Sequence, residues 1–281
     1  MNAEHVLHNF IIYTVQQLHV PYVAIVQPDG SCQRLLTAGN VAYAAPAISP
    51  DGHHIAVARN SGSGWDGIWL MNANGSGLTK LVGHSTFDGS PAWSPSGTQI
   101  AFRSENPGPF GPYGRIYLVN VDGTGLHQLS PETTDYTYDD EPAWSPDGQR
   151  IAFTRNGRLE VINVDGTGLT ELAQNGEYPA WSPNGAQLAY DAFIGGTSYS
   201  IVVANADGSN PTVVNTDTTQ EEEPRWSPDG QQLVFERLVF YPTVGNVFQL
   251  FTMHADGSGV TRLSKPSPTA SEGEPSWSPL P

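Results

Sequence analysis

The chain has 281 residues, including 30 glycines and 23 prolines, a turn-rich composition that excludes a long helical bundle. Only 14% of the residues are charged and 38% are hydrophobic, so the chain can bury a core and is not expected to be disordered. The net charge of −16 repels phosphate backbones and anionic lipid surfaces, so nucleic acid is not an expected partner. A single cysteine, Cys32, excludes an internal disulfide and a cysteine metal cage.

The N-terminal region is apolar from Phe10 to Val26. Two glutamines and a histidine interrupt this stretch and no basic segment leads into it, which argues against a membrane-spanning helix and against a signal peptide. Its pattern instead predicts strands at Ile11–Thr14, Val23–Gln27 and Gln33–Leu36, with a turn at Asp29-Gly30. We therefore expect no membrane insertion.

The remainder of the chain repeats a Trp-Ser-Pro triplet. Copies begin at Trp93, Trp144, Trp181, Trp226 and Trp277, and Ile48 takes the tryptophan position of a sixth. The six serines are 37 to 51 residues apart, which is the period of a four-stranded propeller blade. Each tryptophan has the same place on an inner strand, so we expect these side chains to pack against the adjoining blade.

A second marker, Asp-Gly or Asn-Gly, lies between the triplets. It also occurs six times, beginning at Asp29, Asn74, Asp122, Asp165, Asp207 and Asp256. Proline followed by Asp-Gly and Asp-Gly alone both favour tight hairpin turns, so these aspartates are expected to be structural. Each repeat thus contains four short strands.

The two ends of the chain together supply the four strands of one blade. The last repeat stops after its first strand, Pro275–Ser278, and the N-terminus supplies three strands. The sequence predicts an all-β, six-bladed propeller of four-stranded antiparallel blades. It is one domain, residues 1–281, in which residues 1–37 and 273–281 share the closing blade. This closure protects sheet edges.

The Trp-Ser-Pro-Asp-Gly and Asn-x-Asp-Gly markers resemble the repeats of TolB-like propellers over essentially the whole chain. The resemblance implies a six-bladed propeller of the TolB C-terminal type, and it extends to the propellers of prolyl oligopeptidase-like hydrolases. Neither the small α/β domain of TolB nor a hydrolase domain has a counterpart, and Gly-x-Ser-x-Gly is absent. The resemblance implies an extracytoplasmic location, periplasmic or secreted, with any signal peptide removed from this chain.

Long connections on one face of the predicted ring carry aromatic residues. These connections, residues 60–67, 104–115, 192–200 and 237–249, join second to third strands, and we call this side the variable face. Loops on a rigid scaffold commonly bind ligands, so four aromatic residues are candidate contacts: Trp65, Tyr113, Tyr199 and Tyr241. The alternative is that these aromatics pack only against their own loops. The opposite face, made of the tight turns, is expected to be uninvolved.

Acids gather in the connections that enter the inner strands. Thirteen of the 28 acids lie there: Asp88, Glu132, Asp135, Asp139, Asp140, Glu141, Glu177, Asp217, Glu221, Glu222, Glu223, Glu272 and Glu274. The ligand-binding candidates among them are Asp140, Glu141, Glu177, Glu222, Glu223 and Glu274. Glu141, Glu223 and Glu274 immediately precede the Pro-x-Trp strand and Glu177 lies one residue further back, so the sixfold symmetry points these four toward one channel mouth. Hard carboxylate oxygens favour Ca²⁺, for which the candidate ligands are Glu141, Glu177, Glu223 and Glu274. A solvated acidic rim without a ligand is the alternative, and no organic cofactor is expected.

Arg225 precedes a tryptophan where other blades have alanine, and we expect it to pair with the acids at 221–223. The histidines form no metal-ligand pattern and nothing locates a Ser-His-Asp triad, so no catalytic residue is assigned.

The preferred functional hypothesis is a monomeric, non-catalytic extracytoplasmic module. It would bind a partner protein or a cationic peptide at the loop face and acidic channel mouth. One alternative is a divalent-metal-dependent hydrolase, lactonase or lyase that uses the same carboxylates. Another is that the chain is the propeller part of a longer protein.

Overall fold

Tight turns cut the chain into short strands that pair with their sequence neighbours. In the Ser145 turn, the hydroxyl donates to Asp147 Oδ1 at 2.6 Å and the Gly148 amide donates to the Ser145 carbonyl at 2.8 Å. Gly148 has φ of 69°, a conformation that favours glycine. The hydrogen bond from Ser145 lowers the pKa of Asp147. This confirms the structural role expected for the turn aspartates.

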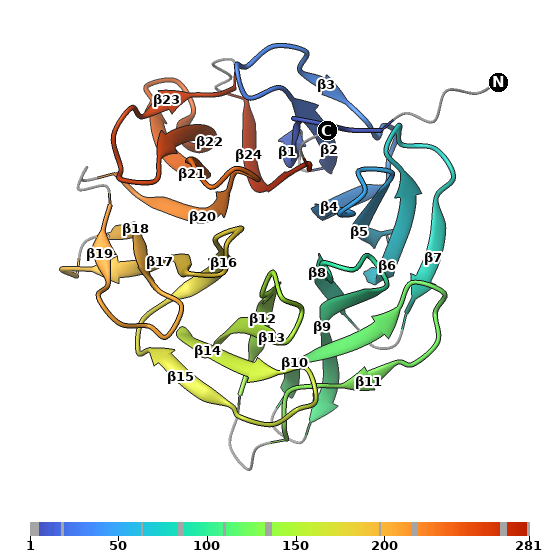
Figure 1. Ribbon diagram of the computed structural model, residues 1–281. Coiled ribbons are helices and arrows are strands. Elements are labelled where there is room, and N and C mark those ends of the chain that lie inside the picture. The colour runs from blue at the N-terminus through green and yellow to red at the C-terminus, as the bar shows by residue number, and fades with distance from the viewer. Residues whose placement is uncertain are drawn as a thin grey trace.

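The computed structural model describes residues 6–17, 20–62, 64–83, 87–108, 111–132, 137–196, 198–214, 219–264 and 269–279. These residues form six four-stranded antiparallel sheets in a ring, the predicted six-bladed propeller (Figure 1). We name each blade by its inner strand, except the closing blade.

The strands of each blade follow in order from the centre outward. The closing blade contains β24 (Ala270–Trp277), β1 (Ile11–Gln17), β2 (Val20–Val26) and β3 (Arg34–Leu35). The β4 blade contains β4 (Ala42–Ile48), β5 (His54–Asn60), β6 (Trp65–Asn72) and β7 (Thr79–Val82). The β8 blade contains β8 (Asp88–Trp93), β9 (Gln99–Gly108), β10 (Gly111–Asn120) and β11 (His127–Gln128).

The other three blades follow the same plan. The β12 blade contains β12 (Asp139–Trp144), β13 (Arg150–Arg155), β14 (Arg158–Asn163) and β15 (Thr170–Ala173). The β16 blade contains β16 (Glu177–Trp181), β17 (Gln187–Ile194), β18 (Ser198–Asn205) and β19 (Thr212–Val213). The β20 blade contains β20 (Glu221–Trp226), β21 (Gln232–Tyr241), β22 (Gly245–His254) and β23 (Thr261–Arg262).

The ring closes as the sequence predicts. Strand β24 pairs antiparallel with β1 between Ile11↔Trp277 and Gln17↔Ala270. Just beyond this ladder, the Phe10 amide donates to Ser278 Oγ at 2.7 Å and the Ser278 amide donates to the Phe10 carbonyl at 2.8 Å. The two ends of the chain therefore hold one sheet together.

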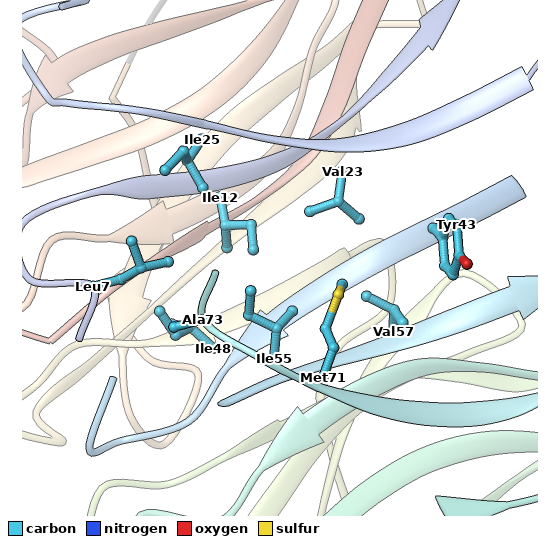
Figure 2. Packing of buried hydrophobic residues seen from close by; sticks show 10 residues of the cluster. All are labelled: Leu7, Ile12, Val23, Ile25, Tyr43, Ile48, Ile55, Val57, Met71 and Ala73. Carbon is cyan, nitrogen blue, oxygen red and sulfur yellow. The ribbon is translucent and has the colours of Figure 1, made fainter. Parts of the chain in front are cut away.

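The hydrophobic core lies between neighbouring blades. Figure 2 shows Ile12, Val23 and Ile25 of the closing blade directed toward Ile55 and Met71 of the β4 blade. Further clusters of buried apolar residues join other neighbouring blades, such as β16 with β20. Each second strand has an apolar motif near its start, Ile-Ala-Phe at residues 100–102 and 151–153 and similar triplets in the other blades, which we call the second-strand motif. Each sheet is covered by the next, which allows this motif to be buried almost completely.

The tryptophans of the repeat join each blade to the preceding one. Every indole Nε1 donates to a backbone carbonyl of the previous inner strand: Trp93 to Ala47, Trp144 to Ala92, Trp181 to Ala143, Trp226 to Ala180 and Trp277 to Arg225, at 3.0–3.2 Å. The expected packing against the adjoining blade is confirmed. Ile48 fills the sixth position without a side-chain donor.

Three connections that are expected as loops are largely hairpins, and in one of them β17 and β18 stay paired as far as Ile194↔Ser198. Strands β9 and β10 stay paired as far as Gly108↔Gly111, and β21 and β22 as far as Tyr241↔Gly245. The variable face therefore carries projecting β-hairpins, because the extra residues continue the antiparallel ladder. Within the described part of the chain, no helix has the length and apolar character needed to cross a membrane.

Candidate functional site

Each inner strand contains a β-bulge just before its proline. The ladder to the second strand shifts register at this point in all six blades. The bulge residues have φ of 49–56° and are Ala45, Ser90, Glu141, Tyr178, Glu223 and Glu274, which we call the bulge ring. Proline disfavours the right-handed helical region for the residue before it and donates no ladder hydrogen bond, so the bulge forms there.

The bulge ring includes three of the four acids predicted to converge. In the β16 blade the bulge residue is Tyr178. Glu177 lies one residue earlier, at the level of Asp140 and Glu222. Burial together with the charges of Glu222 and Asp140 raises the pKa of Glu177. Glu177 is outside the bulge ring because it lies one residue further back in its strand, as the sequence already places it, and its convergence with the other three stays a prediction.

A second ring of residues lies beside the bulge ring. It is formed by the fourth residue of each second-strand motif: Thr14, Ala58, Arg103, Thr154, Asp191 and Glu236. Three of these side chains accept a hydrogen bond from the bulge amide of the following blade: Thr154 from Tyr178 at 3.2 Å, Asp191 from Glu223 at 3.2 Å and Glu236 from Glu274 at 3.1 Å.

Sequence reasoning missed Asp191 and Glu236. The signal was present, because both stand at the place that threonine holds in Ile-Ala-Phe-Thr. When the blades are aligned at their second strands as well as at their tryptophans, an acid stands at a position that should be half-buried. Such an acid is a candidate site residue.

Burial controls the ionisation of these acids. It raises the pKa of Glu223 to about 7, with Glu274 adding to the effect. Burial and the adjacent Glu223 carboxyl raise the pKa of Glu236 well above its ordinary value. Burial also raises the pKa values of Glu141 and Asp191, with contributions from neighbouring acids. The cluster is therefore only partly ionised at neutral pH.

Three other acids of the connections that enter the inner strands, which together form the predicted acidic funnel, are fully buried and do not face a channel mouth. Asp139 binds Arg155, with Nε to Oδ1 at 2.6 Å, and Glu221 binds Arg237, with Nε to Oε1 at 2.9 Å. Asp88 accepts from Ser104 Oγ at 2.6 Å. Because the bulge intervenes, the side chains of these acids point in a different direction from those of the bulge-ring residues two positions later. Asp135 and Asp217, also counted in the predicted funnel, lie outside the described residues.

A cavity of about 690 Å³ occupies the centre of the ring. Apolar groups line it at the tight-turn side, including the five repeat tryptophans, Ile48, and the turn prolines Pro50, Pro228 and Pro279. Glu141, Glu223 and Glu274 line it at the bulge ring, together with Asp140, Arg103 and Arg225. The carboxylates thus lie inside the channel, and the tight-turn face contributes to the same cavity, contrary to the sequence-based expectation.

A smaller cavity of about 280 Å³ adjoins the closing blade, where Glu236, Glu272 and Glu274 contribute to its wall. Glu272 is 3% exposed, and burial raises its pKa.

The candidate aromatic contacts are divided. Trp65 lines the large cavity and packs against Phe87, with ring centroids 5.8 Å apart. Tyr113, Tyr199 and Tyr241 are not among the described residues of its wall. Tyr199 packs against Phe193 of the same hairpin, and the Tyr241 hydroxyl accepts from Arg262 at 2.6 Å. For Tyr199 the observed contact matches the alternative of packing within its own loop, whereas Tyr241 contacts β23 of the same blade.

The expected ion pair of Arg225 does not form among the described residues. Its guanidinium donates to the carbonyls of Pro224 at 2.9 Å and Tyr178 at 3.4 Å. Glu221 is bound to Arg237 instead. Arg225 therefore places its positive charge in the cavity wall, near Glu223, whose pKa it lowers against the effect of burial.

A preformed metal site is not evident in the described part of the chain, where no three His, Cys, Asp or Glu side chains are placed to hold one ion. Two of the candidate ligands already accept protein hydrogen bonds. Glu274 Oε2 accepts from Thr14 and from the Ala45 amide, and Glu141 Oε2 accepts from Thr154 at 2.9 Å. Calcium binding stays a prediction.

Comparisons with known proteins agree with this architecture. The TolB beta propeller domain model matches residues 111–281. An uncharacterized protein of Agrobacterium fabrum is 30% identical over 131 residues, 45% of this chain and 44% of that protein. A TolB homolog of Chlorobium luteolum is 32% identical over 128 residues, 44% of this chain and 26% of that protein. The match therefore spans less than half of the length of either relative.

The crystal structure of TolB from Acinetobacter baumannii has a similar fold, with a TM-score of 0.79 at 18% identity, covering 96% of this chain and 67% of that one. The family model matches more than half of the chain, and the ring of six blades is the architecture that the repeats predict. The chain belongs to the TolB beta propeller domain family.

Proposed function

We propose that this chain is a non-catalytic, extracytoplasmic binding module that holds a positively charged segment of a partner protein in its central channel. The observation that carries the proposal is the position of Glu141, Glu223 and Glu274 in the wall of a 690 Å³ cavity. The size of this cavity is suited to a few side chains and not to a folded domain. Membership of the TolB family supports the extracytoplasmic location.

The charges around the channel support a cationic partner. Arg103 lines the cavity but is bound to Asp140 and lies 3.5 Å from Glu105, so acids neutralise it. Arg225 is the other cation of the described wall. The whole chain carries a net charge of −16, which attracts cations over longer distances and speeds their encounter.

The test is a titration of fluorescently labelled lysine- and arginine-rich peptides, with acidic peptides of equal length as the comparison. The double variant Glu141→Gln, Glu223→Gln should weaken binding of cationic peptides at least tenfold, and added salt should weaken binding to the unmodified protein. The matched control is Glu132→Gln, Glu171→Gln, which removes the same charge from exposed positions. Equal weakening by both double variants, or binding of the acidic peptides, contradicts the proposal.

A further inference from the structure

We infer that the group recognised in the channel is one aliphatic ammonium, the side chain of a partner lysine, seated with its methylene chain along the tryptophans and its ammonium at Glu223. This inference rests on the proposed function and specifies its chemical determinant. It is carried by the shape of the cavity and by an unpartnered oxygen in its wall.

The cavity changes in character along its length. Tryptophans such as Trp144 and Trp226 line the part between the tight turns and the bulge ring, and prolines complete this apolar wall. The carboxylates of Glu141, Glu223 and Glu274 follow at the bulge ring. An unbranched chain of methylenes that ends in a cation matches this order, because it buries its apolar stem against indole rings and places its charge among acids.

Glu223 is the acid in this wall that is best placed to accept a hydrogen bond from a ligand. Its side chain is 6% exposed, and its Oε2 has no hydrogen-bond partner among the described residues. A buried carboxylate oxygen without a donor is unfavourable, and an ammonium supplies three N–H donors. Glu236 lies within hydrogen-bond reach of Glu223, so the two carboxyls can share a proton in the free protein, and an arriving ammonium would displace that proton to solvent.

The acids of this wall suit an ammonium better than a guanidinium. Glu141 belongs to the β12 blade, Glu223 to the β20 blade and Glu274 to the closing blade. The hydrogen bonds described for Glu141 and Glu274 all end on Oε2. The acceptor of Glu223 that lacks a partner among the described residues is one oxygen, Oε2, which one ammonium N–H can satisfy, whereas a planar guanidinium binds best to both oxygens of a carboxylate through two parallel bonds.

The experiment uses the whole chain with ¹⁵N-labelled tryptophans and follows the indole N–H signals by NMR. The probe is N-acetyl-lysine methylamide, and its partners are the norleucine, arginine and Nε-acetyl-lysine derivatives. We expect the lysine derivative to shift the signals of the cavity tryptophans and the other three to bind at least tenfold more weakly. Glu223→Gln should weaken lysine binding at least tenfold, whereas the exposed control Glu132→Gln should leave it unchanged.

Several results would overturn the inference. Equal binding of the norleucine or arginine derivative would show that the channel does not select an ammonium. An unchanged affinity of Glu223→Gln for the lysine derivative would show that Glu223 does not bind the ammonium. Tighter binding of 1,5-diaminopentane than of the lysine derivative would identify a free polyamine as the ligand. If lysine-rich and arginine-rich peptides bind equally, this inference fails while the proposed function stands; if no cationic peptide binds, the proposed function fails as well.

Discussion

Six residues with the same backbone conformation carry different chemistry in the bulge ring. Ala45 and Ser90 are small, Tyr178 is aromatic, and three members are acids. The positions are equivalent by symmetry, so the difference in side chains makes one part of the channel wall acidic and lines another part with small side chains. At the residue scale, the properties of the site therefore depend on individual substitutions within a repeated frame.

The raised pKa of Glu223 should make stability depend on pH. Its folded pKa is about 7 and its ordinary value is 4.5, so between these values the folded state holds a proton that the unfolded chain has lost. The free energy of unfolding therefore falls as pH rises from 4.5 to 7, by an amount on the order of 2–3 kcal/mol, since one pKa unit corresponds to about 1.4 kcal/mol.

The variant Glu223→Gln cannot ionise and should lose this contribution. We expect it to be more stable than the unmodified protein at pH 8 by about 2 kcal/mol, and close to it at pH 5. Urea unfolding at the two pH values is the measurement, with the exposed Glu171→Gln as the control. Because Glu236 also has a raised pKa, the variant should keep part of the pH dependence. A shift of equal size at both pH values would contradict this account.

The tryptophan hydrogen bonds allow a second prediction at this scale. Trp226 is 7% exposed and its Nε1 donates to the Ala180 carbonyl at 3.2 Å. Trp226→Phe should lower the free energy of unfolding by about 1–2 kcal/mol, because a largely buried carbonyl loses its donor. Trp65→Phe is the control, since the described contact of Trp65 is the packing of its ring on Phe87. Equal losses in a thermal or urea melt would show that ring size alone matters.

At the scale of the element, each inner strand is an ordinary strand interrupted at one residue. The bulge presents its residue to the channel and offers its amide to the neighbouring blade. The Ala45 amide, for example, donates to Glu274 Oε2 at 2.6 Å. A regular strand would keep that amide in its own ladder. Because of the bulge, one residue both lines the channel with its side chain and contacts the neighbouring blade with its amide.

The left-handed conformation at the bulge predicts opposite effects of glycine at nearby positions. Ala45 has φ of 49°, so Ala45→Gly should raise the free energy of unfolding by up to about 1 kcal/mol by relieving strain at Cβ. Ala47 lies in the regular part of β4, and Ala47→Gly should lower the free energy by about 0.5–1 kcal/mol. Urea unfolding compares the two variants, and the same sign for both would refute the role given to the bulge.

At the scale of the whole molecule, one blade is assembled from both ends of the chain. Removal of residues 269–281 would delete β24, leave the edge of β1 unpaired and break the Trp277 contact with Arg225. We expect a loss of at least several kcal/mol, on the scale of a domain's total stability, and a strong fall in melting temperature.

A synthetic peptide of residues 269–281 provides the control for that truncation. Added in trans, it should restore part of the melting temperature, whereas a scrambled peptide should not. An unchanged melting temperature after the truncation would mean that the closure does not stabilise the ring.

The sequence by itself determined the blade number, the closing arrangement and the structural role of the turn aspartates. These features depend on local chemistry: proline and Asp-Gly set the turns, and the 37 to 51-residue spacing sets the repeat. The role of the tryptophans in contacts between blades was predictable as well, because the tryptophan has the same position in each of the five repeats that contain it.

Only the tertiary structure decided which acids share the channel. It placed Tyr178 in the bulge ring, added Asp191 and Glu236 beside the ring, and paired Asp139 with an arginine. It also showed that the tight-turn face contributes to the cavity. The physical reason is that a side chain's direction changes at a bulge, and its partners come from the next blade. Both depend on contacts between residues far apart in the sequence, which the repeat pattern alone does not contain.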